Sequence, residues 1–248
     1  MENKSNIKQT IKKEYNDVCA NSNKAFNLAL VFATVVLFVY CYFGSFSFFE
    51  KTFSGAKDLH YWKIIYHNCM SFVLFFCLGV LYTKFVIKEP LKNYGLKLEN
   101  KKLALVLIAV ALPITALCGL STVLDKGMTD TYPLVNLATY GSWHHVLMYF
   151  ASYFLYYVGW EYLFRGLLLN TTKNALNPLA AILLTTLVSA LIHTSIGGFG
   201  KPMIETLSAI PAGLIFGYIA HKTKSIYPTL FIHFFVGLFT DIFIFFLA

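Results

Sequence analysis

Charged side chains are scarce in this chain: they make up 13% of its 248 residues, whereas 57% are hydrophobic. A soluble domain carries about 25% charged residues, so the composition excludes an ordinary soluble fold. The length suits one helical bundle without an appended soluble domain. We therefore predict an all-α, polytopic membrane protein, and we expect it in a bacterial cytoplasmic membrane.

Paired cysteines, internal repeats and low-complexity tracts are also absent. None of the five cysteines forms a C-x-x-C pair, and most lie in apolar runs, where cysteine acts as a small hydrophobe. This excludes a zinc ribbon and a disulfide framework. The net charge is +8, but the lysines lie between hydrophobic segments. This placement favours contact with lipid headgroups and excludes a nucleic-acid partner.

The main feature of the sequence is its long apolar runs. A span needs about 20 mainly apolar residues, and only helices satisfy their own backbone hydrogen bonds in lipid without closing into a barrel. We predict about seven spans, within a range of six to eight. The segments are 25–48, 64–83, 103–124, 145–169, 179–196, 204–221 and 226–247.

The lysines also predict an orientation and a domain plan. With the N-terminus inside, fifteen of the twenty lysines and arginines fall on the inner side, which fits the positive-inside rule. Residues 1–24 lie too far ahead of the first apolar run for a signal peptide, and we expect a partly disordered cytoplasmic tail. Residues 25–142 form a three-helix part, and 143–248 form a four-helix core of catalytic type.

Three of the later apolar runs carry ionisable side chains that we select as candidates: Glu161, Arg165, His193 and His233. A charged side chain near a bilayer centre costs roughly 2.5–3.5 kcal/mol on lenient scales, so such residues are functional candidates by default. A carboxylate and two imidazoles suffice to activate water and to stabilise an oxyanion. We expect Glu161, His193 and His233 to converge on one water-filled pocket.

Structural roles are the alternatives. Glu161 and Arg165 are four residues apart, share a helix face and could form an ion pair that locks helix packing. His193 could share a face with Ser189 or bond to a neighbouring helix. His233 could be oriented by Asp241, although we place Asp241 at the outer end of its helix.

Two further residues have open roles. Glu205 could line the cavity or meet the membrane interface, and we weigh these two roles equally. Trp160 packs against lipid or a neighbouring helix, or it plugs the water site, and we favour packing.

The ionisable residues lie in short motifs. The stretch Trp160-Glu-Tyr-Leu-Phe-Arg-Gly-Leu-Leu-Leu169 resembles the Glu-Glu-x-x-x-Arg motif of the CPBP family of CAAX-processing and bacteriocin-processing intramembrane endopeptidases, also called the Abi family. Ser189 to His193 resembles its Phe-x-x-x-His motif, and Lys224 to His233 matches the approach to its His-x-x-x-Asn motif. The similarity spans roughly residues 143–241.

The resemblance implies an intramembrane peptidase that cleaves a peptide or membrane-protein substrate near the cytoplasmic face. Glu161 would be the base that activates water, and Arg165 would fix its orientation and charge. His193 and His233 would bind a metal or stabilise the oxyanion. A divalent metal such as zinc is a candidate cofactor, with Glu161, His193 and His233 as candidate ligands. A glutamate that binds zinc is, however, poorly placed to act as the base.

Three motif positions depart from the family pattern. Trp160 replaces the first glutamate, which is credited there with activating water; Ser189 replaces an aromatic residue, and Gly237 replaces an asparagine that supports the oxyanion. These departures support an alternative: a non-catalytic relative that binds peptides or membrane proteins, as in bacteriocin immunity or regulation. A transporter or proton relay ranks last, because it predicts an internal symmetry that we do not detect.

Overall fold

A computed structural model describes residues 8–13, 23–194 and 200–248, and across these ranges the chain forms helices, turns and bends but no strand. Residues 8–13 of the tail are helical and exposed. The predicted disorder of the rest of the tail falls mostly outside the described residues. The prediction of an all-α membrane protein is confirmed.

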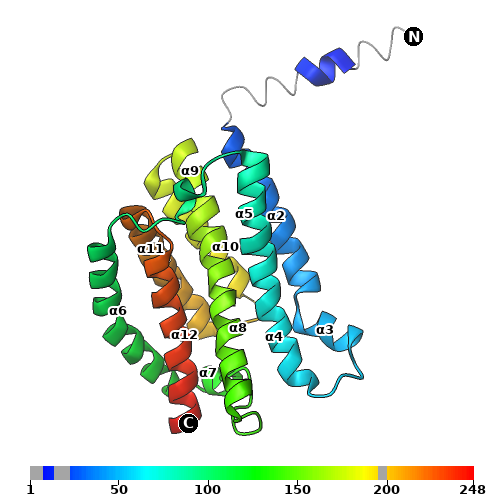
Figure 1. The fold of residues 1–248 in the computed structure, drawn as a ribbon, viewed down its shortest axis with the longest axis vertical. Coiled ribbons are helices and arrows are strands. Elements are labelled where there is room, and N and C mark those ends of the chain that lie inside the picture. The colour runs from blue at the N-terminus through cyan, green and yellow to red at the C-terminus, as the bar shows by residue number, and fades with distance from the viewer. Residues whose placement is uncertain (1–7, 14–22, 195–199) are drawn as a thin grey trace.

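The described chain forms seven long helical segments, each of which overlaps one of the seven predicted segments but differs from it at the ends (Figure 1). They are α2 (Lys24–Phe43); α4 (Leu59–Ser71) continued by η1 (Phe72–Cys77), α5 (Leu78–Tyr82) and η2 (Thr83–Ile87); α6 (Lys101–Ser121); α8 (Trp143–Glu161) continued by η5 (Tyr162–Leu168) and α9 (Leu169–Ala175); α10 (Pro178–His193); α11 (Met203–Thr223); and α12 (Tyr227–Leu247). Shorter elements connect them: α3 (Phe46–Thr52), η3 (Leu91–Tyr94), η4 (Thr122–Leu124) and α7 (Lys126–Thr131).

Five of these segments are long and apolar enough to cross a membrane: Lys24–Phe43, Leu59–Ile87, Lys101–Leu124, Met203–Thr223 and Tyr227–Leu247. Pro178–His193 is apolar but shorter, and the segment that begins at Trp143 carries many tyrosines and is not among the five. A multi-pass membrane protein is therefore established, and the count of about seven spans stays a prediction.

Local sequence sets several helix starts. The side chains of Asn23, Asn100 and Asn177 each accept a hydrogen bond from the backbone N–H three residues later. This bond satisfies one of the N–H groups that the first turn of a helix leaves without a partner. Pro178 then occupies the first turn of α10, where its missing N–H costs nothing.

Close helix contacts occur at small residues. In the bundle α4 packs on α8, α6 on α12 and α10 on α11 (Figure 1). A Cβ atom on Gly159 would meet the backbone carbonyl of Ser71, and one on Gly119 would lie 2.8 Å from the backbone of Phe239. Without a strong hydrophobic drive in lipid, helices associate by such close approach.

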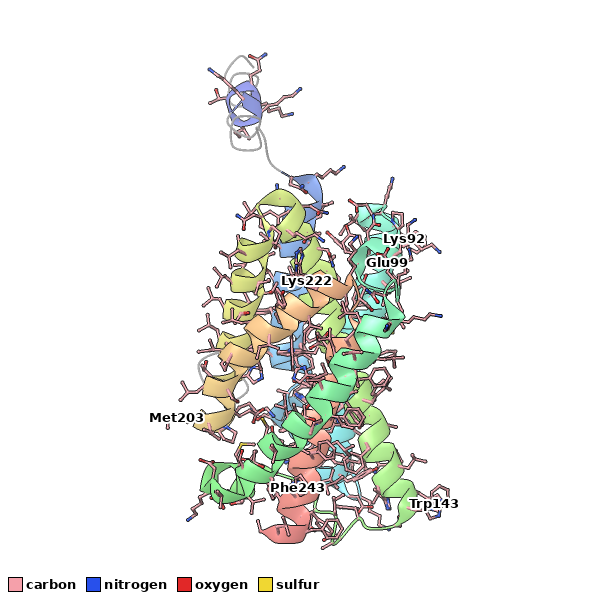
Figure 2. The ribbon with its side chains drawn as sticks, turned by 90° about the vertical axis from the view of Figure 1, so that its left-hand side faces the viewer. Lys92, Glu99, Trp143, Met203, Lys222 and Phe243 are labelled. Carbon is pink, nitrogen blue, oxygen red and sulfur yellow. The ribbon has the colours of Figure 1, made fainter. Side chains whose placement is uncertain are left out.

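Labelled residues identify the two ends of the bundle (Figure 2). Lys92, Glu99 and Lys222 lie at one end, which we call the N-terminal end because α2 begins there; Trp143 and Phe243 lie toward the other, which we call the far end (Figure 2). Glu99 contacts Lys97 at 3.0 Å and Lys224 at 3.7 Å. The predicted cytoplasmic placement of the N-terminal end stays a prediction.

Candidate active site

The first part of the site is an ion pair at the end of α8. Arg165 Nη1 lies 3.6 Å from Glu161 Oε1, and the two side chains are 4% and 0% exposed. As predicted from their spacing, they share one helix face. The helix widens to a π-helix over Tyr162–Leu168, a local geometry that is frequent at functional sites. Arg165 Nε has no hydrogen-bond partner among the described residues.

His233 on α12 joins this pair. Its Nδ1 lies 2.8 Å from Glu161 Oε1, and because a carboxylate only accepts, we assign the ring proton to Nδ1. An imidazole that carries its only proton on Nδ1 has its lone pair on Nε2. The His233 ring lies 4.4 Å from Tyr157 and 5.1 Å from Phe216, centroid to centroid. These contacts fix its plane.

His193 is the last residue of α10. Its Nδ1 lies 2.6 Å from the backbone oxygen of Ser189, so Nδ1 is the donor, since a carbonyl oxygen only accepts. The Ser189 hydroxyl donates instead to Thr186 O. Ser189 and His193 therefore share a helix face as predicted, but His193 contacts the backbone oxygen of Ser189 and not its hydroxyl. The His193 ring meets Trp160 edge-on, with 5.6 Å between centroids.

Two adjoining cavities, of about 140 and 310 Å³, lie where these helices meet. Arg165 and Gly237 border the larger one, whereas Glu161 borders neither. Both cavities are bordered by the same seven residues: Tyr132, Tyr153, Tyr157, Trp160, His193, Glu205 and His233. The structure thus brings His193 and His233 to one cavity system, with Glu161 behind His233.

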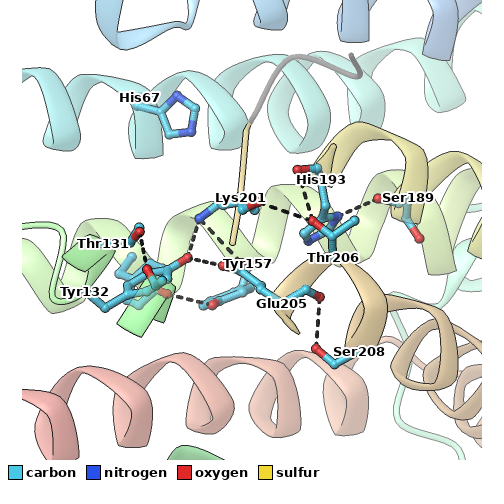
Figure 3. A network of polar contacts seen from close by, with 12 residues as sticks. His67, Thr131, Tyr132, Tyr157, Ser189, His193, Lys201, Glu205, Thr206 and Ser208 are labelled. Atoms are coloured by element: carbon cyan, nitrogen blue, oxygen red, sulfur yellow. Dashed lines mark hydrogen bonds and ion pairs between the residues drawn. The ribbon is translucent and has the colours of Figure 1, made fainter. Parts of the chain in front are cut away.

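A polar network that sequence reasoning largely missed borders the same cavities (Figure 3). The Tyr132 hydroxyl donates to Glu205 Oε2 at 2.8 Å, Lys201 Nζ lies 3.5 Å from Glu205 Oε1, and Lys201 also donates to the Tyr132 oxygen. Burial and the Glu205 carboxylate raise the pKa of Tyr132, so its hydroxyl stays protonated. The i, i+4 spacing of Lys201 and Glu205 just before an apolar run was the available signal.

Trp160 and Asp241 have clear positions. Trp160 is 1% exposed and packs on Tyr156 and Phe164 at 5.8 and 4.7 Å between ring centroids. It therefore packs within the protein, as favoured, and it also borders both cavities. Asp241 is fully buried and accepts from the Tyr149 hydroxyl at 2.6 Å. It therefore serves Tyr149 rather than His233.

His67 also borders the smaller cavity, and it was not among the predicted site residues. Its Nε2 lies 2.8 Å from the Tyr40 hydroxyl, and its Nδ1 lies 2.7 Å from Gly44 O. Both ring nitrogens are therefore engaged in contacts that tie α4 to the end of α2. We assign this histidine a structural role.

The candidate donor set does not match a metal centre. Within the described ranges no group of three or more His, Cys, Asp or Glu side chains is arranged to hold an ion. Catalytic zinc sites use three protein ligands, whereas Glu161, the third candidate ligand, borders neither cavity and already accepts from His233 Nδ1. The predicted metal stays a prediction, and no step below depends on one.

A comparison with protein families supports the resemblance predicted from the motifs. Residues 142–239 match the Rce1-like family model, described as type II CAAX prenyl endopeptidase Rce1-like. The resemblance to CAAX-processing endopeptidases of the CPBP family is thereby confirmed. No curated protein and no solved structure matches the chain.

Proposed function

We propose that this protein is an intramembrane peptidase of the CAAX-protease type, because residues 142–239 match the Rce1-like family model. One observation carries the proposal: His193 and His233, from two different helices, border one cavity system, and a buried Glu161–Arg165 pair lies directly behind His233. Buried charge at membrane depth is costly unless it is used.

The proposed base is a dyad of His233 and Glu161. Glu161 has no exposed surface and borders neither cavity, so it acts on the water through His233. His233 Nε2 takes the proton from a cavity water while Nδ1–H donates to Glu161. The hydroxide adds to the substrate carbonyl carbon, and His233 then gives the proton to the leaving amine. Arg165 keeps Glu161 ionised and in place.

His193 borders both cavities together with His233. With its Nδ1 held by Ser189 O, its neutral ring has no second N–H to donate. We assign it the positioning of water and of the scissile peptide. The predicted role of His193 as oxyanion donor would require the protonated ring.

Substrate entry is proposed at the far end. The smaller cavity is bordered by Ser45, Phe46, Leu134, Gly200 and Lys201, which connect helices at that end. If the N-terminal end is cytoplasmic, this opening faces the outer side. The lining of the smaller cavity supports cleavage toward the far end, while the orientation and cleavage near the cytoplasmic face stay predictions.

A peptide-binding protein without catalysis is the second candidate. The indole of Trp160 stands at the position of the family's first glutamate and borders both cavities. An apolar ring at that point removes a carboxylate from the water site. This candidate predicts peptide binding without turnover.

The test is cleavage by the purified protein in lipid nanodiscs. The probes are a farnesylated CAAX peptide and an unprenylated transmembrane peptide, each with a fluorophore–quencher pair. We expect cleavage of at least one, loss in His233→Gln and in His193→Ala, and retention in His144→Ala. His144 is exposed and stacks on Trp143, so it is a matched surface control. Binding without cleavage by the wild type would refute the peptidase and support the binding protein.

A further inference from the structure

Gly237 occupies the position at which the resemblance places an oxyanion-supporting asparagine, and its surroundings are informative. It lies on α12 and borders the larger cavity. A Cβ atom on Gly237 would lie 2.6 Å from the Tyr153 hydroxyl oxygen and against the Tyr157 hydroxyl oxygen. The space that an asparagine side chain would need is therefore already filled by two phenol hydroxyls.

These hydroxyls form a pair on one face of α8. The Tyr157 hydroxyl donates to the Tyr153 oxygen at 3.0 Å, and the two rings are 4.9 Å apart. Within the described part of the chain, the Tyr153 proton has no acceptor. Both tyrosines border both cavities beside His233. A free O–H donor is thus available next to the proposed base.

The reaction needs such a donor. When hydroxide adds to a peptide carbonyl, the carbonyl oxygen gains a negative charge, and donors placed for that oxygen are a large part of catalysis. The Nδ1 atoms of His193 and His233 already donate to Ser189 O and to Glu161. A neutral imidazole that donates through Nδ1 has no second N–H for an oxyanion.

We propose that Tyr153, supported by Tyr157, is the oxyanion donor and takes the place of the asparagine that Gly237 replaces. The Tyr153 hydroxyl donates a hydrogen bond to the carbonyl oxygen during attack and keeps its proton throughout. Tyr157 holds Tyr153 through its own donated bond. The absence of a side chain at Gly237 is the condition that lets both hydroxyls occupy this position. This assignment rests on the proposed peptidase function.

The test uses tyrosine-to-phenylalanine variants, which remove a hydroxyl and keep the ring. Removal of one oxyanion-hole donor typically lowers kcat roughly 10²–10³-fold. We expect that loss in Tyr153→Phe/Tyr157→Phe, with KM changed by less than about threefold, because the interaction forms in the transition state. Tyr153→Phe alone should lose less, since the Tyr157 proton is then free to donate. Tyr218→Phe, at an exposed tyrosine, is the control and should be unchanged.

A rescue distinguishes catalysis from structure. Gly237→Asn in the wild-type background should impair the enzyme, because the new side chain collides with both hydroxyls. In Tyr153→Phe/Tyr157→Phe the two colliding hydroxyl oxygens are gone. The ring of residue 153 must still shift to make room, because Tyr153 Cε1 lies 2.9 Å from the new Cβ position. An amide donor there should restore kcat at least about tenfold. A purely structural role predicts no such rescue.

The outcomes separate the two proposals. If the wild type cleaves and Tyr153→Phe/Tyr157→Phe keeps kcat within about threefold of it, the oxyanion assignment is overturned while the peptidase stands. If the double variant is inactive and Gly237→Asn does not restore it, the assignment also fails. A wild type that cleaves neither probe peptide overturns the peptidase and this assignment together.

Discussion

The Glu161–Arg165 pair supports a sharp prediction about stability and catalysis together. The two charges are 3.6 Å apart, and their side chains are 0% and 4% exposed. At an effective dielectric of 20, that distance corresponds to an attraction of about 4–5 kcal/mol, which is opposed by the cost of burying both charges. Removing one partner leaves the other charge buried alone, which typically costs about 3–5 kcal/mol.

We therefore predict a strongly non-additive cycle. Glu161→Met and Arg165→Met should each destabilise the fold by about 3–5 kcal/mol. The double variant removes both charges and keeps similar volume, so only the lost acceptor of His233 Nδ1 remains, at about 1–3 kcal/mol. The measurement is unfolding of each variant in mixed detergent micelles, followed by tryptophan fluorescence.

The same double variant then tests the mechanism. It should be folded and unable to cleave, because His233 no longer has the Glu161 carboxylate that orients it. A double variant that loses as much stability as the two single variants combined would show that the pair is not coupled. A folded double variant with wild-type turnover would refute the His233–Glu161 dyad. The Glu161–Arg165 pair would then have only a role in helix packing.

Three further outcomes are expected. Gly159→Ala forces a Cβ against the Ser71 carbonyl and should destabilise by about 1–3 kcal/mol in the same unfolding assay, whereas Gly55→Ala, with nothing within 4 Å, should stay within about 0.5 kcal/mol. Glu205→Gln keeps an acceptor for Tyr132 and should retain turnover within about tenfold; a loss beyond 100-fold, the range expected for a general base, would instead make Glu205 the base. The His233–Glu161 dyad needs no metal to activate water, so treatment with 1,10-phenanthroline should leave cleavage unchanged; inhibition reversed by added zinc would contradict the dyad.

The helices could be predicted from sequence because apolar runs of span length have few other solutions in lipid. Their ends were less accessible. The first segment was predicted over 25–48, but the helix ends at Phe43; Gly44 follows, and the Ser45 side chain then caps a separate short helix by accepting from Phe48 N. Hydropathy does not register such caps, because they depend on one polar side chain within an apolar run.

The site was partly predictable for the same reason. Ionisable residues are conspicuous in apolar helices, so Glu161 and His233 could be selected from sequence. In the structure the two side chains form a hydrogen bond with each other. Tyr153 and Tyr157 could not be selected from sequence. The chain has sixteen tyrosines and 24 phenylalanines, and nothing in the sequence distinguishes the two proposed donors from aromatic residues that pack or lie at the membrane interface. Which hydroxyl meets Gly237 depends on how α8 and α12 cross, and a single sequence does not contain that relation.

The two main departures from the family pattern have different physical consequences. At position 160 a carboxylate is replaced by an indole that is 1% exposed, which removes a polar group from the cavity. At position 237 an amide is replaced by two hydroxyls from another helix, which keeps a donor in the same place. A site under no chemical demand would fill that space with apolar atoms, because buried hydroxyls carry a desolvation cost. The retained donor beside His233 therefore supports the proposed peptidase, with the His233–Glu161 dyad as its base, over the proposed binding protein.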